Sequence, residues 1–218
     1  MFHLGISERK ERQRRDLRQE ILTAALQVFA IEGYQQLSMR RLAEKIEYSP
    51  TTIYLHFKDK AALFECVCEE TFSQLSEIFF DIVARAADPL DALLKCCRAY
   101  VEFGLQHPDQ YKVAFLLDSG QRLDPDEVLE KFPKAMQAFY QLRCGVDQCM
   151  KNGDLTDGSP DLVSQVIWAG LHGLTALFIV KPSFPWSDKD ALLDLTVHTM
   201  IRSLRPAGAD FPVLTAQA

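Results

Sequence analysis

Residues 49–57 read SPTTIYLHF, and this stretch decides how the N-terminal part of the chain folds. Ser49 belongs to the residue types that cap the start of a helix. Pro50 fits the first helical position, because the N–H that proline lacks would have no intrahelical partner there. Helical spacing then places Ile53 and Phe57 on one face, which we expect to be buried. The stretch therefore predicts a short helix that ends near Phe57.

The opposite face of this helix carries small or hydrogen-bonding side chains. A helix of about two turns is too short to be stable alone, so neighbouring helices must supply the burial. The preceding residues fit, since Ser38 is placed to cap a helix over residues 39–46 that a tight turn joins to the next one. Two short helices joined in this way indicate a helix-turn-helix, whose second helix lies in the DNA major groove. The residues predicted to face outward are Thr51, Thr52, Tyr54, Leu55 and His56.

Apolar residues recur at helical spacing along most of the chain, and no segment has the alternation and turn residues of a β-hairpin. The sequence therefore predicts an all-α protein of about nine helices. We expect an N-terminal arm and helix-turn-helix domain over residues 1–60, a helical domain over 61–205 and a flexible tail over 206–218. The predicted helices span residues 16–31, 39–46, 50–57, 60–86, 89–106, 109–117, 125–151, 160–180 and 187–204.

Charge is distributed unevenly along the chain. The net charge of −6 argues by itself against a nucleic-acid partner. Residues 1–60, however, contain eleven Lys and Arg against eight Asp and Glu, whereas the remainder contains thirteen against twenty-two. This asymmetry points to a nucleic-acid or membrane contact at the basic end. The basic run RKERQRR, residues 9–15, is either a solvated helix extension or an arm that contacts phosphates or the minor groove, and we favour phosphate contact.

Targeting and cysteine patterns both suggest a cytoplasmic protein. No run of about 20 apolar residues predicts a membrane span, and the N-terminus lacks the apolar segment and cleavage site of a signal peptide. The six cysteines form no C-x-x-C pair and no zinc-finger spacing, so we expect reduced thiols in the core. A redox pair of Cys144 and Cys149 is the alternative.

The acidic part of the chain carries no recognisable catalytic set. It has no nucleophile motif, no phosphate-binding glycine loop and no di-metal helix signature. We therefore expect no enzymatic activity, no cofactor and no metal. Its histidines are isolated in sequence, and a lone histidine such as His172 is more often a satisfied core residue than a ligand.

Three stretches of the N-terminal part resemble one family of bacterial regulators. They are AALQVFAIEGY (residues 24–34), SMRRLAEKI (38–46) and SPTTIYLHFKDKAALF (49–64). Together they are similar to the TetR, or tetracycline-repressor, family of transcription regulators. A weaker resemblance is IWAGLHGL (167–174), which looks like a Trp/His-Gly sequence of one branch of TetR-type C-terminal domains.

The resemblance implies roles in DNA contact for residues of both short helices. Tyr54, His56 and Lys60 would contact phosphates, with Lys60 aided by a helix N-terminus. Arg40 would read a base, because an arginine fork pairs best with guanine. Leu55 would contact a thymine methyl group. An alternative for Tyr54 is simple packing against the first helix, and for His56 simple solvation. The implied set is Ser38, Arg40, Thr51, Thr52, Tyr54, Leu55, His56 and Lys60.

The turn between the two short helices departs from the family pattern. The family usually has glycine and then a small aliphatic residue there, whereas this chain has Glu47 and Tyr48. A left-handed conformation at Glu47 would cost on the order of 1 kcal/mol, because its Cβ approaches the backbone. A carboxylate near DNA is also unfavourable. The turn is therefore either strained or shaped differently.

The resemblance further implies a homodimer, formed when the last two helices of each subunit pack into a four-helix bundle. Small residues on the helix over residues 160–180 would allow another helix to approach closely. The alternative is that they pack against helices of the same subunit, which a crowded core also requires. The implied interface is Ala169, Gly170, Gly173, Leu174, Phe178, Leu192, Leu195 and Thr199.

A second implication is an apolar cavity for a small-molecule effector, enclosed by the fifth to eighth predicted helices. Aromatic side chains with a few polar tips suit a largely apolar ligand, although the same stripe is compatible with an ordinary core. Ligand binding would favour a conformation whose two recognition helices are wrongly spaced, through a tilt of the helix over residues 60–86. The implied lining is Phe103, Tyr111, Phe115, Met136, Phe139, Tyr140, Trp168 and His172.

The sequence thus predicts a dimeric repressor that binds a palindromic operator in double-stranded DNA and is released by an apolar ligand. The alternative is a helical regulator that acts through protein–protein contacts and whose helix-turn-helix is vestigial. The negative net charge and Glu47 favour the alternative.

Overall fold

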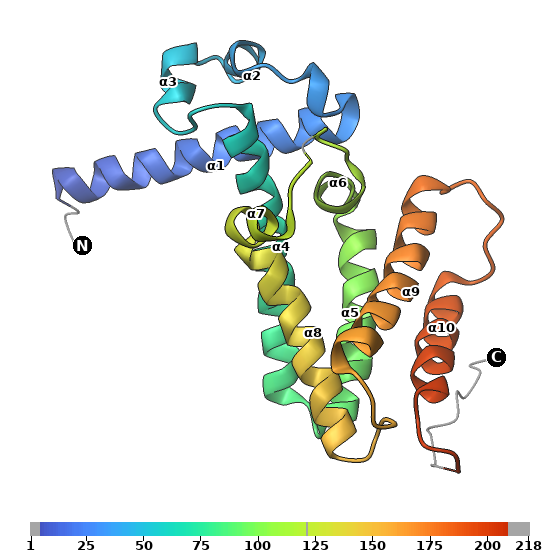
Figure 1. Cartoon of the computed structure of the whole chain (residues 1–218). Coiled ribbons are helices and arrows are strands. Elements are labelled where there is room, and N and C mark those ends of the chain that lie inside the picture. The colour runs from blue at the N-terminus through green and yellow to red at the C-terminus, as the bar shows by residue number, and fades with distance from the viewer. Residues whose placement is uncertain (1–4, 121, 209–218) are drawn as a thin grey trace. The chain divides into compact units, whose positions relative to one another are not determined.

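The computed structural model describes residues 5–120 and 122–208 (Figure 1), and within these residues it contains helices and no strand. The predicted all-α class is confirmed, with ten α-helices in the described residues where about nine were expected. Residues 209–218, most of the predicted tail, lie outside the described residues. The helices are α1 (Ile6–Glu32), α2 (Met39–Lys45), α3 (Pro50–Tyr54), α4 (Lys60–Arg85), α5 (Pro89–Gln106), α6 (Pro108–Tyr111), α7 (Pro125–Lys131), α8 (Pro133–Lys151), α9 (Pro160–Val180) and α10 (Lys189–Ser203).

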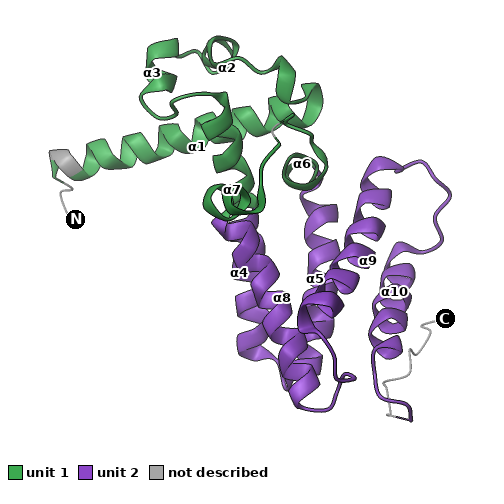
Figure 2. Cartoon of the chain, in the orientation of Figure 1, with its two compact units in different colours: residues 1–71, 109–132 green, residues 72–108, 133–218 purple. Residues whose placement is uncertain are grey.

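The chain forms two compact units (Figure 2). Unit 1 contains the residues up to Thr71 together with Asp109–Phe132, and unit 2 contains Phe72–Pro108 and the residues from Pro133 onward. The boundary therefore falls within α4, not at residue 60, and residues 109–132 join the N-terminal helices. The packing of the π-helix Lys112–Leu116 against α1 accounts for part of this difference. As a division of function, the ranges 1–60 and 61–205 stay a prediction.

Unit 1 is organised around the second half of α1. Ile21, Ala25 and Phe29 are almost completely buried there. Phe29 stacks on Tyr34 with ring centroids 5.7 Å apart, and Phe64 of α4 meets both rings edge-on. Aromatic contacts of this kind join three segments of unit 1, because each ring buries a large area and fixes the orientation of its neighbour.

Unit 2 is a bundle in which α5, α8 and α9 pack against one another and α10 packs against α5 and α9. One side of each helix supplies the core, as the helical repeat requires. Val101, Val146, Ile167 and Ile201 are fully buried representatives of α5, α8, α9 and α10.

Two predicted elements were wrong in ways that have a physical cause. The helix expected over 125–151 is broken at Phe132, whose φ of −127° and ψ of 55° are not helical. Pro133 causes the break, because its ring disfavours the helical conformation of the preceding residue. The helix expected over 109–117 consists of α6 followed by the π-helix Lys112–Leu116.

The first helix begins at Ile6, ten residues earlier than predicted, so the described part of the predicted N-terminal arm is helical. The Gly5 N–H donates to Glu8 Oε2 at 2.9 Å, which satisfies a backbone donor at the helix start. Arg, Lys, Glu and Gln dominate the following residues and are good helix formers. Of the two interpretations of residues 9–15, the helix extension describes their conformation.

Candidate nucleic-acid interface

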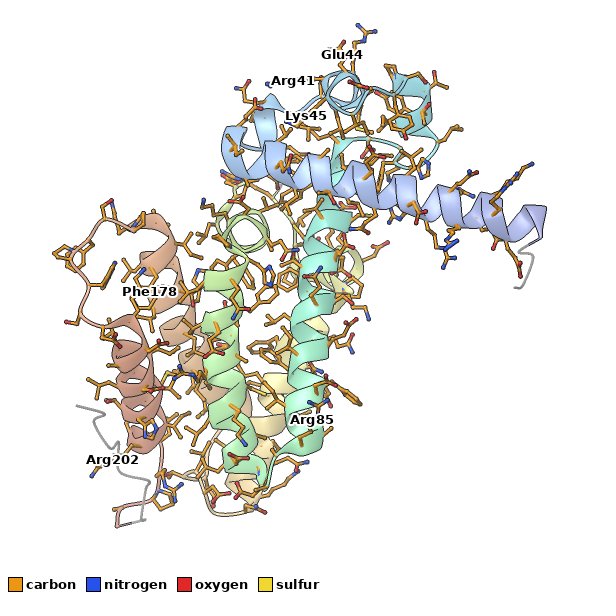
Figure 3. The ribbon with its side chains drawn as sticks, turned by 180° about the vertical axis from the view of Figure 1, so that it is seen from behind. Arg41, Glu44, Lys45, Arg85, Phe178 and Arg202 are labelled. Carbon is orange, nitrogen blue, oxygen red and sulfur yellow. The ribbon has the colours of Figure 1, made fainter. Side chains whose placement is uncertain are left out.

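The start of α2 is fixed by a cap and by an ion pair. The Arg41 N–H donates to Ser38 Oγ at 3.2 Å, so Ser38 is the predicted N-cap. The Arg41 guanidinium lies 2.6 Å from the Glu32 carboxylate and also donates to the Gln36 carbonyl. Figure 3 labels Arg41. Arg40 and Arg41 are both exposed, but the Arg41 side chain is engaged by these contacts. Arg41 therefore joins α2 to the end of α1, and the base contact expected of Arg40 stays a prediction.

The turn after α2 is strained at Glu47, as one of the two sequence alternatives predicted. Glu47 has a φ of 60°, the only positive φ at a non-glycine among the described residues. The Tyr48 N–H donates to the Ala43 carbonyl at 2.9 Å, and the Glu47 N–H to the Glu44 carbonyl at 3.3 Å. This pair of bonds is a Schellman motif, which ends a helix with a left-handed residue. The chain therefore keeps the sharp turn and accepts a side chain where glycine would be unstrained.

Helix α3 turns one face inward and the other outward, as predicted. Ile53 is fully buried and Phe57 is nearly so, whereas Tyr54 is 54% exposed and Leu55 is 72% exposed. About half of the Tyr54 side chain is therefore accessible, and its role in DNA contact stays a prediction. Thr51 is also exposed. The helix proper ends at Tyr54, earlier than predicted, but the Phe57 N–H still donates to the Ile53 carbonyl at 3.0 Å.

The cap of α3 engages one of the two threonines. Ser49 Oγ accepts from the Thr52 N–H at 3.1 Å and also lies 2.8 Å from Thr52 Oγ1. Thr52 is half-buried and helps to close the N-terminus of α3, so Thr51 is the more accessible of the two hydroxyls.

His56 lies beside the arginines of α1. Burial lowers its pKa, and the nearby charges of Arg14 and Arg18 lower it further. The Arg18 guanidinium lies 4.5 Å from the centre of the Phe57 ring and donates to Cys66 Sγ at 3.4 Å. The C-terminal end of α3 therefore sits in a positive environment, in which a phosphate would be attracted.

The Lys60 side chain makes contacts within the chain. Its ammonium donates to the Tyr34 carbonyl at 3.2 Å and lies 4.3 Å from the Tyr34 ring centre. An ammonium has three donors, so one bond to a carbonyl leaves capacity for a phosphate. The structure nevertheless gives Lys60 a packing role that sequence reasoning missed.

Unit 1 thus presents an exposed α3 face on a capped, sharply turned scaffold, next to a basic helix. Residues 21–67 match the family model for bacterial regulatory proteins of the tetR family, and residues 93–200 match the model for a tetracycline-repressor-like C-terminal domain. The chain belongs to the TetR family. The two matches place the family resemblance on both units and not only on the helix-turn-helix.

Known relatives fit this assignment. The chain is 30% identical to the HTH-type transcriptional regulator AcrR of Shigella flexneri over 40% of this chain and 41% of that protein. It is 39% identical to the HTH-type transcriptional repressor AcnR of Corynebacterium diphtheriae over 28% of this chain and 32% of that protein. The matches thus span less than half the length of either relative. The fold is also that of a tetR-family regulatory protein from Rhodococcus RHA1, with a TM-score of 0.69 and 20% identity over 87% of this chain and 97% of that one.

The residues predicted to line an effector cavity do not all belong to one unit. Tyr111 and Phe115 lie in unit 1, where their rings stack 4.5 Å apart, and the other six lie in unit 2. Within unit 2, Tyr140 is 60% exposed, so its ring contributes little to an interior site. Phe103 is buried and lies 5.0 Å from the ring of His107.

Trp168 is the centre of the predicted aromatic cluster. Its Nε1 donates to Tyr100 Oη at 3.2 Å, and its ring lies 6.0 Å from Phe139 and 6.1 Å from His172. Burial lowers the pKa of His172, so the imidazole is neutral at pH 7. Sequence reasoning missed Tyr100, although its position three residues before Phe103 on a predicted helix was available as a signal.

The predicted dimer residues divide into exposed and internal ones. Ala169, Gly170 and Thr199 are exposed, Leu195 is 54% exposed, and Gly173, Leu174 and Leu192 are partly exposed. Phe178, labelled in Figure 3, is instead 2% exposed. Its ring meets the Trp186 ring edge-on, with centroids 5.1 Å apart. A Cβ at Gly170 would meet Met200 Sδ at 2.9 Å, whereas one at Gly173 would meet nothing within 4 Å. Phe178 therefore packs inside its own subunit, and Gly170 lets α10 approach α9.

Helix α9 has an apolar outer face beyond these residues. Leu162, Val166, Leu177 and Val180 are each at least about half exposed. By length and composition α9 would suffice to cross a membrane, whereas the sequence predicted no such segment. In unit 2 one side of α9 packs against α5, α8 and α10, and its apolar character reflects both that packing and the exposed stripe.

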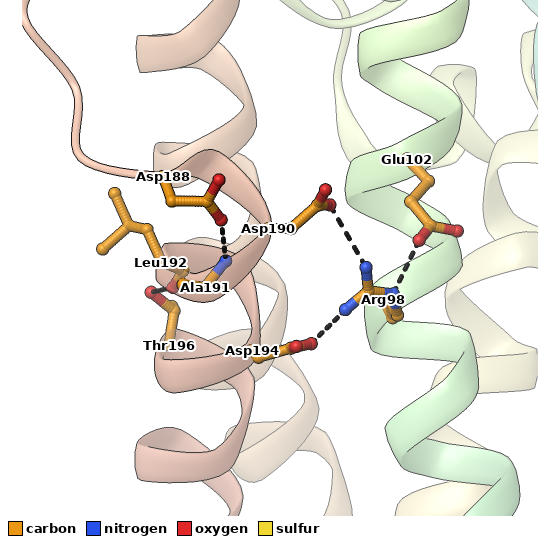
Figure 4. Close-up of polar contacts among 8 residues, drawn as sticks. All are labelled: Arg98, Glu102, Asp188, Asp190, Ala191, Leu192, Asp194 and Thr196. Atoms are coloured by element: carbon orange, nitrogen blue, oxygen red, sulfur yellow. Dashed lines mark hydrogen bonds and ion pairs between the residues drawn. The ribbon is translucent and has the colours of Figure 1, made fainter. Parts of the chain in front are cut away.

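A charged cluster attaches α10 to α5 (Figure 4). Arg98 of α5 is hydrogen-bonded to Glu102 at 2.6 Å and to Asp194, and lies 3.2 Å from Asp190. Arg98 and Glu102 are spaced i, i+4, a pairing that sequence can indicate. Asp190 and Asp194 lie 92 and 96 residues from Arg98, and spacing in the sequence does not reveal ionic partners so far apart.

The cysteines are all free. Burial raises the pKa of Cys96 to about 11 and that of Cys149 to about 12, so both are thiols at neutral pH. Cys144 and Cys149 lie five residues apart on α8 and point to different sides of it. A redox role for this pair stays untested.

Proposed function

We propose that this chain is a transcriptional repressor that binds a palindromic DNA operator as a homodimer and is released by a small, largely apolar ligand. The observation that carries the proposal is that α3 has one buried face and one exposed face. Ile53 and Phe57 anchor the helix inside unit 1, and Thr51, Tyr54 and Leu55 remain exposed. A recognition helix needs such a face, because bulky or buried side chains would keep it away from the base edges.

The predicted DNA contacts fall into three groups in this proposal. Tyr54 and His56 bind phosphates at the C-terminal end of α3, where Arg14 and Arg18 add positive charge. Arg40, Thr51 and Leu55 face the groove and can read base edges. Ser38, Thr52 and Lys60 each make an internal contact that fixes the scaffold, and their DNA contacts are secondary to it.

Dimerisation through α9 and α10 is supported by the exposed apolar stripe of α9. A stripe of this kind costs solvation free energy in an isolated subunit, and a second copy related by a two-fold axis would cover it. The charged cluster around Arg98 supports the same interface indirectly, since it fixes α10 to α5, and both of these helices pack against α9. The dimer would present its two α3 helices to successive major grooves, which lie about 34–36 Å apart.

The effector site is proposed around Trp168, Tyr100, Phe139 and His172. These side chains offer aromatic surface with hydroxyl and imidazole groups at their edge, which suits an apolar molecule with few polar atoms.

The effector acts in this proposal by shifting a population. It stabilises the conformation that it binds better, and it can change the spacing of the two α3 helices only by its difference in affinity for the two states. Helix α4 belongs to both units and is the element through which a change in unit 2 would reach unit 1. We expect a cytoplasmic protein without catalytic activity.

A salt-titrated binding assay on the intergenic DNA upstream of the gene tests the proposal. The repressor should bind a palindrome with nanomolar affinity, and the affinity should fall steeply as salt rises, because phosphate contacts release counterions. Tyr54→Phe should weaken binding to all sequences about equally, since phosphate contacts carry no sequence information. Flat salt dependence without preference for a palindrome would instead favour the protein-contact alternative with a vestigial helix-turn-helix.

A further inference from the structure

A short 3-10 helix, Tyr34–Gln36, joins α1 to α2 within unit 1. Gly33 precedes it with a φ of 87°, a conformation that glycine adopts without strain and that turns the chain away from α1. Leu37 follows it and is 3% exposed, and Ser38 then caps α2. The placement of α2, and of α3 after the tight turn, therefore depends on how this 3-10 helix is held.

The two ends of the 3-10 helix are bonded to two different α-helices. The Tyr34 carbonyl accepts from the Lys60 ammonium at 3.2 Å, and Lys60 is the first residue of α4. The Gln36 carbonyl accepts from the Arg41 guanidinium at 3.3 Å, and Arg41 belongs to α2. These two bonds make the 3-10 helix a link between the start of α4 and the helix-turn-helix.

The Lys60 ammonium is attracted to Tyr34 in two ways. It lies 4.3 Å from the centre of the Tyr34 ring, in addition to its hydrogen bond with the carbonyl. A cation over an aromatic ring gains most where water is partly excluded, and Tyr34 is 8% exposed. The ring is itself fixed by its contacts with Phe29 and Phe64. A phosphate that drew the ammonium away would cost both contacts.

The start of α4, which carries Lys60, is also fixed. Asp59 Oδ1 accepts from the Ala62 N–H at 2.8 Å, and the Asp59 carbonyl accepts from the Leu63 N–H at 3.2 Å. Asp59 thus caps α4 one residue before Lys60. A change in the direction of α4 therefore moves the Lys60 ammonium and, through it, Tyr34.

We infer that Lys60 is a positioning residue, which couples the direction of α4 to the placement of α2 and α3 through Tyr34, and that it is not a phosphate ligand. This inference rests on the proposed function, because the placement of α3 matters only if α3 reads DNA. Helix α4 belongs to both units, so its first turn is where a displacement of the helix reaches the recognition scaffold. The inference departs from the role that the family resemblance implies for Lys60, which is phosphate contact.

The test compares Lys60→Met with Lys58→Met. Each variant removes one positive charge from the same stretch of chain, and methionine keeps most of the apolar length of the lysine side chain. Lys58 is exposed whereas Lys60 is half-buried, so the control removes a charge and leaves the contacts with Tyr34 in place. Exchange of the backbone amides of residues 34–45 is measured in the free protein. Affinity is measured against salt for the operator and for a duplex of random sequence.

Lys60→Met should speed amide exchange in residues 34–45 at least about fivefold, because the 3-10 helix loses one of its two bonds. It should bind the operator at least about tenfold more weakly and the random duplex within about twofold, since misplaced α3 helices lose base contacts and keep phosphate contacts. Its slope of log affinity against log salt should change by less than about 0.5, whereas one lost phosphate contact in each subunit would lower the slope by about 1.8. Lys58→Met should leave the exchange and the ratio of the two affinities unchanged.

Equal losses of affinity for both duplexes, with a lower slope and unchanged exchange, would make Lys60 a phosphate ligand and overturn the inference. An equal effect of Lys58→Met on exchange would overturn it as well. Lys60→Gln serves if Lys60→Met does not fold, because its shorter neutral amide should show the same pattern to a lesser degree. Failure of the proposed function is recognised separately, since the wild type would then bind no palindrome, while exchange in the free protein would still show whether Lys60 holds the 3-10 helix.

Discussion

Two helices of this chain leave one side uncovered, and the chemistry of the two sides differs. The outer side of α3 carries Thr51, Tyr54 and Leu55 beside a basic helix, whereas the outer side of α9 carries Leu162, Val166 and Leu177. A hydrogen-bonding face with positive neighbours suits a polyanion, and an apolar stripe suits another protein surface. The comparison teaches that exposure alone does not identify a partner, and that the chemistry of the exposed side does.

The largest expected effect comes from placing a charge on the apolar side. Leu177→Glu should convert the dimer to a monomer. Leu177 is 49% exposed in the subunit, and the carboxylate of the new glutamate would be buried in the interface without a partner. Affinity for a palindrome should fall at least about 100-fold, since two half-sites are then bound independently. Sedimentation velocity gives the oligomeric state. Phe80→Glu is the control, because Phe80 is 68% exposed on α4 and not on α9. A fully dimeric Leu177→Glu protein would remove α9 from the interface.

The next largest effect is expected when a residue that reads a base is removed from the polar side. Arg40→Ala should relax the preference at one base position by about 1–3 kcal/mol, as expected when an arginine fork to guanine is lost. Selection of binding sites from a random library measures this preference. Arg41→Ala is a matched control, because Arg41 is paired with Glu32 and should affect the stability of α2 and leave base preference unchanged. An identical consensus for Arg40→Ala and the wild type would contradict the assignment.

The strained turn that supports the polar side gives a smaller effect. Glu47→Gly should stabilise unit 1 by about 0.5–1 kcal/mol, because the relief of left-handed strain exceeds the entropy that glycine adds to the unfolded chain. Hydrogen exchange at the amides of α2 and α3 measures the local free energy of opening. Glu47→Ala keeps a Cβ at the same φ of 60° and should give no comparable gain. Equal protection in the two variants would mean that the Cβ is not the source of strain.

The smallest effect is the pH dependence of binding. Burial, and then Arg14 and Arg18, lower the pKa of His56 in the free protein, so the imidazole is neutral at pH 7. A bound phosphate would favour the charged imidazole, and binding would then take up protons. Affinity should therefore rise as the pH falls from about 7.5 to 6, by at most about tenfold per pH unit for each subunit. His56→Gln should abolish that rise, and a wild-type affinity that is flat over this range would exclude a phosphate contact by His56.

The lowered pKa of His56 has the opposite effect on the stability of the free protein, which should fall as the pH falls. A histidine whose pKa is lower in the folded state than in the unfolded state destabilises the fold once the unfolded form takes up its proton. Stability of the free protein should thus decrease as the pH falls below about 6.5, the ordinary value for histidine. A thermal unfolding series against pH, with His56→Gln as reference, separates this contribution from that of other groups.

Local rules explain most of what could be predicted. Ser38, Ser49 and the prolines at helix starts set the boundaries of several helices within one or two residues, since capping depends only on neighbours in sequence. The inward positions of Ile53 and Phe57 followed from helical spacing. The missed break at Phe132 was a local failure as well, because it follows from Pro133 and could have been predicted from the sequence.

Interactions between distant segments were beyond sequence reasoning. The contacts of Arg98 with Asp190 and Asp194, the close approach of Gly170 to Met200 and the internal packing of Phe178 all join residues that spacing does not relate. The same holds for Lys60, whose ammonium donates to the Tyr34 carbonyl and is therefore not fully available to bind a phosphate. For these residues the type of side chain allowed several partners, and only the packing selected one.

The amino-acid sequence by itself determined the all-α class, the helix-turn-helix and the face that α3 turns outward, because each depends on residues within a few positions of one another. Tertiary structure alone decided which small and aromatic residues of α9 are internal, which unit residues 109–132 join, and how the arginines of α1 lie beside His56 and Phe57. Burial and electrostatic contact depend on distances in space, and a chain folded from many helices sets those distances through packing that no short window of sequence contains.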